Sequence, residues 1–490
     1  MTARFGSARL LAAGLALLLF SAPASAGAPQ PWSPGPWLED LDQMGEALRS
    51  KYANLEWLEG EREVKLDALL SRARSRLAAA GSDAEAIAVF NRLIDRIGDG
   101  HVALDWPAAS RPAAAPPAAT PATPASFCAR LGYDASKSPP GAAKALPGYT
   151  PVGPQDVLPS GIVRIGGEAV GVVRIGLFDP HGSPSLCTEA VAALHIPLAL
   201  PCDDGCQDKV LTFAYRRLTA ALDDRLVRLR AMGAGSVLVD LTGNGGGSEW
   251  AEAAARMFSR RPLLSEATGF IRGEHWTRQW AELGERLRAF AADAPKDDRA
   301  VLLASAAEAD AARAEAARTC TAAAPCARIA RGGFTAGLVG RAPAGAFAGK
   351  LWAPYVFSPA QYSYRDGAWD GPVMVLVDQE TWSAAEEFAA ILQDNRAAII
   401  VGARTGGAGC GHTNGGTPTR LKNSGAVLEV PDCVRFRADG SNEVRGIVPD
   451  VVVGWRHSDG LAYRASLLAP ALPRAIAEAR RLYAARRTGL

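Results

Sequence analysis

The 490-residue chain lacks an excess of charge of either sign. It contains 53 Lys and Arg against 51 Asp and Glu, for a formal net charge of +2, and it has no run of basic residues. Proteins that bind nucleic acid usually carry a clustered basic surface, which appears in the sequence as a basic excess. The composition therefore gives no reason to expect a nucleic-acid partner.

Long apolar runs are also scarce. The first 26 residues, MTARFGSARLLAAGLALLLFSAPASA, combine two arginines, a short apolar run and a small-residue ending of the A-x-A type. This pattern is typical of a secretory signal peptide. The apolar run is shorter than the roughly 18 to 20 residues that span a bilayer, and no later segment reaches that length. We therefore expect an exported protein, periplasmic or secreted, without stable membrane insertion.

Spacings typical of metal-binding cysteine and histidine are missing. All eight cysteines follow residue 26, and most are close neighbours along the chain: Cys202 and Cys206, Cys320 and Cys326, Cys410 and Cys433, with Cys128 and Cys187 remaining. An even number in an exported chain favours disulfides, although the sequence leaves their pairing open. The segment CDDGC is not C-x-x-C and has no histidine spacing beside it, so we expect no metal and no cofactor.

Composition divides the rest of the chain into regions. Residues 32–98 carry apolar positions at three- and four-residue spacing, which predicts helices. A Pro/Ala tract follows that cannot form a packed core, and strands, glycine turns and helices alternate after it. We predict these regions: a helical region over 27–106, a linker or loop over 107–159, an α/β core over 160–470 with a helical insertion at about 275–345, and a C-terminal helix over 471–490.

Two segments each read as a strand, a turn and a helix: VLVDLTGNGGG begins the first, and VLVDQETWSAAEEFAAIL is the second. Ser383 lies at the turn of the second, and the sequence SAAE matches a capping box in which Ser383 and Glu386 cap the helix. A serine at a helix N-terminus also lies where backbone N–H groups can stabilise an oxyanion, and the N–H of Ala384 would be one donor. Capping and catalysis both remain open at this point.

A serine nucleophile needs a base, and two familiar arrangements are absent. No G-x-S-x-G surrounds Ser383, which removes the main signature of an α/β-hydrolase. The third residue after Ser383 is Glu386 and not lysine, so the S-x-x-K arrangement is absent too. The base must therefore come from elsewhere in the chain.

Four segments resemble, in order, motifs of the C-terminal processing (tail-specific) serine proteases: IGDGHVAL (97–104), VLVDLTGNGGG (237–247), TWSAAEEFAAILQDNRAAIIVGARTGG (381–407) and EVRGIVPDVVV (443–453). The resemblance implies an α/β (α+β) core of the tail-specific protease, ClpP/crotonase-like type, with an N-terminal helical bundle. The stretch from Cys128 to Gly166 is too short for a PDZ domain, so we expect none.

The resemblance also bears on the base. Tail-specific members proper use a lysine after the serine, where this sequence has Ala408, and the only lysine after Ser383 is Lys422, outside the motif. The branch that includes the tricorn protease core and the chlamydial protease-like activity factor uses an upstream histidine and a downstream glutamate. Similarity to that branch implies that Ser383 attacks, His101 takes the proton and Glu443 orients the imidazole.

Further site residues follow from the same resemblance. The second oxyanion donor would be a backbone N–H of the GNGGG loop, Gly245 or Gly246, beside that of Ala384. His412, in the loop GAGCGHTNGG, is a possible substrate contact. The sequence departs from the tricorn-type pattern at Gly100, where that branch has a second serine.

These residues predict an exported serine endopeptidase that hydrolyses peptide bonds of a protein or peptide substrate through an acyl-enzyme. We expect the substrate to bind in an extended form beside the core. One alternative is a protein that binds peptides or lipophilic ligands on the same core without catalysis, against which the complete set of Ser383, His101 and Glu443 argues. Another is a hydrolase of esters or small peptides, which the sequence does not separate from a protease.

Overall fold

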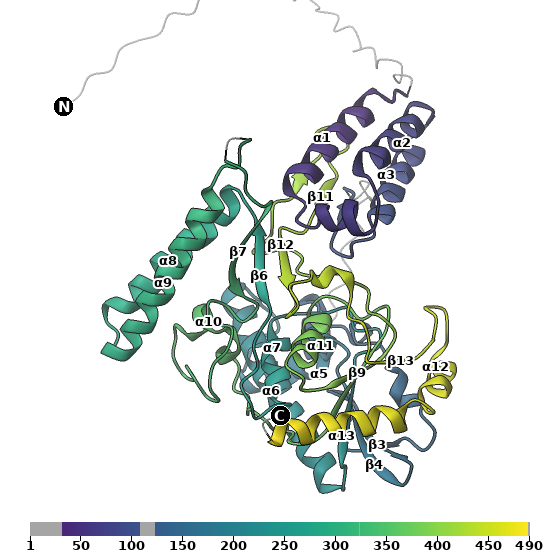
Figure 1. The fold of residues 1–490 in the computed structure, drawn as a ribbon, viewed down its shortest axis with the longest axis vertical. Coiled ribbons are helices and arrows are strands. Elements are labelled where there is room, and N and C mark those ends of the chain that lie inside the picture. Colours follow the sequence, from purple (N-terminus) through teal and green to yellow (C-terminus); the bar gives the residue numbers. More distant parts are fainter. Residues whose placement is uncertain (1–31, 108–122, 323, 489–490) are drawn as a thin grey trace, which may run out of the picture.

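A mixed sheet of seven strands forms the centre of the computed structural model, which describes residues 32–107, 123–322 and 324–488 (Figure 1). Its strand order is β13 (Val451–Val452), β9 (Ile399–Gly402), β8 (Val373–Val377), β5 (Ser236–Asp240), β4 (Glu168–Arg174), β3 (Ser160–Ile165) and β2 (Thr150–Pro151). Neighbours from β13 to β4 pair in parallel, and β3 and β2 complete the sheet in antiparallel fashion. The predicted signal peptide and most of the Pro/Ala tract lie outside the described residues.

Both faces of this sheet are covered by helices. One face, with Val237, Val239 and Val375, packs against α5 (Pro184–Ala193), α6 (Asp204–Ala231), α7 (Trp250–Arg256) and α11 (Ala384–Asp394). The other, with Leu238, Met374 and Leu376, packs against α12 (Leu461–Leu468) and α13 (Leu472–Thr488). Successive side chains of a strand point to opposite faces, so a strand buried on both faces has to be apolar throughout. The predicted α/β core is confirmed.

Three helices stand at the N-terminal end of the described chain: α1 (Gly35–Lys51), α2 (Leu66–Ala78) and α3 (Asp83–Ile97). They lie where the apolar spacing predicts helices, and the hydroxyl of Ser82 caps α3 by accepting from the N–H of Glu85 at 3.3 Å. Their apolar faces pack on a small antiparallel sheet of β1 (Ala103–Asp105), β11 (Val427–Glu429) and β10 (Thr419–Arg420). This contact brings the turn after α3 to the core, although the two are distant in sequence.

A second antiparallel sheet contains β12 (Cys433–Phe436), β6 (Ala267–Ile271) and β7 (Ile329–Phe334). Helices α8 (Glu274–Ala292) and α9 (Lys296–Ala317) follow β6 as a long hairpin that projects from the body (Figure 1). Aromatic residues at the base of this hairpin, Trp276 and Trp280, pack on Phe270 of β6. The short helices α4 (Pro124–Arg130) and α10 (Ala353–Val356) complete the α-helices of the described residues.

All eight cysteines lie in the described residues, and they form four disulfides: Cys128–Cys187, Cys202–Cys206, Cys320–Cys326 and Cys410–Cys433. The structure thus supplies the pairing that the sequence leaves open. Within the described ranges, no cluster of His, Cys, Asp and Glu has the geometry to hold a metal ion, and no helix is long and apolar enough to cross a membrane.

Asp40 joins the N-terminal helices to the core. The side chain is fully buried on α1, and its carboxylate accepts the backbone N–H groups of Asn423 at 2.9 Å and Ser424 at 2.7 Å. The amide side chain of Asn423 adds a bond of 3.1 Å. A buried carboxylate with three donors stabilises this junction, because the carboxylate would otherwise be left unpaired away from water.

We expect Asp40→Ala to lower the free energy of unfolding by about 2 kcal/mol, because it removes the charged acceptor of three hydrogen bonds between α1 and the core. Urea denaturation followed by circular dichroism measures the change. Asp42→Ala on the same helix is the control, since Asp42 and its partner Arg74 are exposed and such pairs contribute less than about 1 kcal/mol. Equal losses in the two variants would contradict this view of the junction.

Candidate active site

Ser383 stands between β8 and α11 in a backbone conformation that residues with side chains rarely adopt. Its φ is +55° and its ψ is −121°, and such a conformation costs on the order of 1–3 kcal/mol unless its surroundings hold it. Two bonds do so. The N–H of Ser383 donates to Glu386 Oε2 at 3.0 Å, and its carbonyl oxygen accepts from Arg435 Nη1 at 3.1 Å.

The predicted capping box places the Glu386 carboxylate on the N–H of Ser383. The N–H of Glu386 donates to the carbonyl oxygen of Ser383 at 2.9 Å, so the serine hydroxyl is not its only acceptor. The hydroxyl of Ser383 is therefore not needed to hold the helix. The sequence does not separate capping from catalysis as the role of Ser383. In the structure the two roles do not compete for the hydroxyl.

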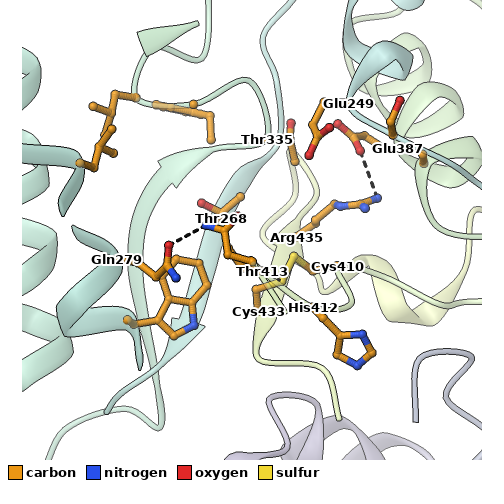
Figure 2. A pocket seen from close by; sticks show the side chains of 18 of the residues that line it. Glu249, Thr268, Gln279, Thr335, Glu387, Cys410, His412, Thr413, Cys433 and Arg435 are labelled. Atoms are coloured by element: carbon orange, nitrogen blue, oxygen red, sulfur yellow. Dashed lines mark hydrogen bonds and ion pairs between the residues drawn. A yellow bond between two sulfur atoms is a disulfide. The ribbon is translucent and has the colours of Figure 1, made fainter. Parts of the chain in front are cut away.

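Ser383 opens into a cleft of about 740 Å³ that His101 also lines. The first turn of α11 and the glycine loop after β5 form one side, and α8 with the sheet β12–β6–β7 forms the other. The disulfide Cys410–Cys433 crosses the wall between the loop that carries His412 and strand β12, which carries Arg435 (Figure 2). The two residues predicted to act as nucleophile and base thus face one cavity.

The glycine loop meets Ser383 because β5 and β8 are adjacent parallel strands whose carboxyl ends lie at the same edge. The N–H of Trp382 donates to the carbonyl oxygen of Asn244 at 2.9 Å. Gly246 has a φ of +110°, and a Cβ there would lie 2.7 Å from the Cβ of Ser383. Only glycine permits this approach.

The N–H groups of Ala384 and Gly247, both in the lining of the cleft near Ser383, have no acceptor among the described residues. Gly245 and Gly246, which the sequence predicts as the second oxyanion donor, are less suitable than Gly247. The N–H of Gly246 donates to Asn244 Oδ1 at 2.8 Å, and Gly245 does not line the cleft. The available donor thus lies one residue after the predicted pair. Asparagine two residues before Gly246 is the sequence signal, since Asn side chains commonly accept from the N–H two residues on.

His101 is held by the turn that follows α3. Gly98 ends the helix with a φ of +63°, and the buried carboxylate of Asp99 then accepts the N–H of His101 at 3.0 Å. The second oxygen of Asp99 accepts from the hydroxyl of Tyr52 and the amide of Asn54, both at 2.9 Å. The D-G-H segment is therefore a rigid support for the histidine backbone.

The imidazole of His101 is oriented by a backbone carbonyl. Its Nδ1 lies 2.8 Å from the carbonyl oxygen of Ala408. A carbonyl oxygen only accepts hydrogen bonds, so Nδ1 carries the proton and Nε2 has a free lone pair. Burial lowers the pKa of His101, against the opposing effects of the Ala408 bond and the charge of Asp99. The neutral imidazole, which is the form a general base needs, is favoured.

Glu386 links the nucleophile to the histidine. Besides the N–H of Ser383, its buried carboxylate accepts the N–H groups of Gly407 and Ala408, both at 2.8 Å, and the hydroxyl of Thr405 at 2.5 Å. Ala408 is the residue whose carbonyl oxygen orients His101. Burial, with the nearby charge of Glu443, raises the pKa of Glu386 to about 7. The sequence alone predicts Glu386 only as a helix cap.

Glu443 does not contact His101 as a direct orienting group would. Its buried carboxylate, on the 3-10 turn Glu443–Arg445, lies 3.2 and 3.3 Å from Arg435 Nη1. The same nitrogen donates to the carbonyl oxygen of Ser383. The expectation of a direct Glu443–His101 bond is therefore wrong for this geometry, because a buried guanidinium takes up the carboxylate and Ala408 takes up the imidazole proton.

Ala408 occupies the position where tail-specific proteases have a lysine, and it is tightly packed. Ala408 is buried, and a Cβ at Gly100 would lie 3.2 Å from the Cβ of Ala408. Glycine at 100, which departs from the tricorn-type pattern, thus makes room for the loop that orients His101. Lys422 lies outside the cleft, exposed and paired with Glu39 at 2.8 Å.

His412 lines the cleft beside the histidine of the D-G-H turn. Its ring centroid is 5.9 Å from that of His101, at an interplanar angle of 72°, and its Nδ1 is 3.9 Å from Glu429. In Figure 2 the imidazole of His412 stands at the rim, next to the disulfide. This position is compatible with the predicted role as a substrate contact.

The family model of peptidase family S41 matches residues 209–453, half of the chain. The chain belongs to peptidase family S41. The matched region contains the glycine loop, Ser383 and Glu443, and His101 lies outside it. No curated protein sequence matches this S41 peptidase.

Solved structures share the fold of this S41 peptidase. Mature CPAF superposes with a TM-score of 0.58 at 13% identity, covering 91% of this chain and 98% of that chain. Mature CPAF complexed with lactacystin gives 0.58 at 15% identity, with 91% and 99% covered. A putative peptidase from Parabacteroides merdae gives 0.48 at 14% identity, with 91% and 97% covered. The CPAF matches confirm the fold class expected from the motifs.

The raised pKa of Glu386 predicts a pH-dependent stability. Because the pKa rises from 4.5 to about 7 on folding, the folded S41 peptidase takes up a proton between these values. Relative to Glu386→Gln, the wild type should lose about 3 kcal/mol of unfolding free energy as pH rises from below 4.5 to above 7. Urea denaturation at pH 4.5 and 7.5 measures the difference.

The matched control for this measurement is Glu285→Gln, which removes an exposed carboxylate of α8 outside the cleft. That variant should follow the wild type at both pH values. If Glu386→Gln also runs parallel to the wild type, the carboxylate does not titrate between these pH values as its burial implies.

Proposed function

We propose that this S41 peptidase is an exported serine endopeptidase in which Ser383 attacks the substrate carbonyl and His101 accepts the serine proton. One observation carries the proposal: a serine in a strained conformation and a histidine with a free Nε2 line the same cleft. Four disulfides and the composition of the first 26 residues support export, because disulfides persist in oxidising compartments.

In the acylation step, Ser383 Oγ bonds to the carbonyl carbon of the peptide while its proton moves to His101 Nε2. The N–H groups of Ala384 and Gly247 stabilise the resulting oxyanion. The imidazolium then gives its proton to the leaving amine as the C–N bond breaks, which leaves an acyl-enzyme. Water repeats the sequence with His101 as its base and releases the acid product and Ser383.

The surrounding groups position these two residues. The carbonyl of Ala408 keeps the proton of His101 on Nδ1 and stabilises the imidazolium. Arg435 holds the backbone carbonyl of Ser383, and Glu443 pairs with that guanidinium. Glu443 thus acts through Arg435 on the position of the nucleophile, a different role from the orienting one that the family resemblance implies.

We expect Ser383→Ala and His101→Ala to lower turnover by about 10,000-fold or more, because each removes a partner in the proton transfer. Hydrolysis of an unfolded protein substrate and labelling by a fluorophosphonate, with the labelled residue identified by mass spectrometry, measure the effect. Lys422→Ala is the control and should keep full activity, since Lys422 is remote from the cleft.

Two outcomes would contradict the proposal in different ways. Loss of activity in Lys422→Ala with retention in His101→Ala would make lysine the base. Turnover of a small ester without cleavage of any peptide would identify an esterase instead of a peptidase.

The lowered pKa of His101 sets the pH dependence of catalysis. Because burial stabilises the neutral imidazole, the base remains unprotonated down to a pH below its ordinary value of 6.5. We expect kcat/KM to fall on acidification with a midpoint below pH 6.5 and to stay level above it. Initial rates at low substrate concentration between pH 4.5 and 8.5 test this, and a midpoint well above 6.5 would exclude His101 as the base.

A further inference from the structure

Glu387 occupies a position next to the nucleophile that the mechanism above does not use. It lies in the first turn of α11, four residues after Ser383, which immediately precedes the helix. Glu387 lines the same cleft as Ser383 and is only 4% exposed. A substrate whose carbonyl reaches Ser383 would bring its adjacent side chain to Glu387.

The carboxylate of Glu387 is only partly satisfied. Its Oε2 lies 3.5 Å from Arg435 Nη1, whereas its Oε1 is buried and has no hydrogen-bond partner among the described residues. A buried carboxylate oxygen without a donor is costly. Glu387 therefore has unused acceptor capacity in the wall of the cleft.

The neighbours of Glu387 do not supply that donor. Arg435 already binds both oxygens of Glu443, and the hydroxyl of Thr335 donates to buried Glu252. Glu249, on the exposed side, adds a second carboxylate next to Glu387, and Figure 2 shows these two acidic side chains beside Thr335. This end of the cleft thus carries two carboxyl groups, and the guanidinium of Arg435 is shared with Glu443.

The remaining charged groups of the lining lie on α8. Glu282 and Arg286 are one helical turn apart and have opposite charges. The guanidinium of Arg286 donates to the hydroxyl of Tyr355 at 3.0 Å and lies over its ring at 4.9 Å. The acidic pair Glu387 and Glu249 is therefore confined to the side that carries Ser383.

We propose that Glu387, together with Glu249, forms a specificity subsite for a lysine or arginine side chain on the substrate residue that carries the attacked carbonyl. The inference rests on the proposed role of Ser383. A cationic side chain would donate to the unpaired Oε1 and neutralise the acidic pair. An apolar or acidic side chain would leave that oxygen buried without a partner, which is how a site rejects a substrate that lacks the matching group.

The pKa of Glu387 makes this role dependent on pH. Burial raises the pKa of Glu387 well above its ordinary value, Arg435 opposes the rise, and Glu252, Glu443 and Glu249 add to it. A bound cation would favour the ionised form, so binding should release a proton. Because deprotonation prepares the subsite, preference for a cationic residue should strengthen as pH rises.

The test uses the full-length protein and two fluorogenic peptides that differ only at the residue before the cleaved bond, lysine in one and uncharged norleucine in the other. A peptide library, with its cleavage sites mapped by mass spectrometry, first supplies the common sequence. We expect kcat/KM to be higher for the lysine peptide by about tenfold or more. Glu387→Gln should reduce this ratio to near one, and Glu249→Gln should reduce it in part.

Glu285→Gln is the matched control, since it removes the same charge from an exposed position outside the cleft, and it should keep the wild-type ratio. Fluorophosphonate labelling of Ser383 reports on the nucleophile independently. Absence of both labelling and cleavage would overturn the proposed function. Labelling with equal rates for the two peptides, or an unchanged ratio in Glu387→Gln, would overturn the subsite alone. If Glu387→Gln does not fold, an unchanged ratio in folded Glu249→Gln has the same meaning.

Discussion

The buried carboxylate of Glu386 is the interaction on which the candidate site depends. It accepts hydrogen bonds from the backbone of Ser383 on one side and from Thr405, Gly407 and Ala408 on the other. Removing it would leave four donors unpaired in the interior, so the helix start and the 405–408 loop are stable only together. The strained serine and the carbonyl that orients the histidine are consequently placed by one group.

Much of the fold could be predicted because buried helices and strands have apolar residues at regular spacings along the sequence. The run Val373–Val377 is apolar at every position because helices cover both faces of the sheet. Ser383 was identifiable from a strand, a turn and a capping box, which are local signals. His101 was different: its own surroundings in the sequence indicate only a polar turn, and the family resemblance alone connected it to a serine 282 residues later.

The sequence did not indicate two kinds of contact. One is made by backbone groups, which every residue has, and the other is made by side chains that meet only in the folded chain. Every residue has a carbonyl, so nothing marked that of Ala408 as the partner of His101. Arg435 and Glu443 are eight positions apart, yet their pairing depends on where β12 ends relative to the following turn. The expected Glu443–His101 bond failed for this reason: the competing guanidinium could be located only in three dimensions.

The first turn of α11 concentrates these functions. The nucleophile, the carboxylate that positions it and the carboxylate proposed to select the substrate occupy positions 383, 386 and 387, at the start of one helix. Burying two adjacent glutamates with one shared guanidinium nearby is unfavourable for folding alone. Glu386 offsets its cost with four donors, whereas Glu387 retains an oxygen without one. The difference between these neighbours is the physical reason to assign the first to structure and the second to a ligand.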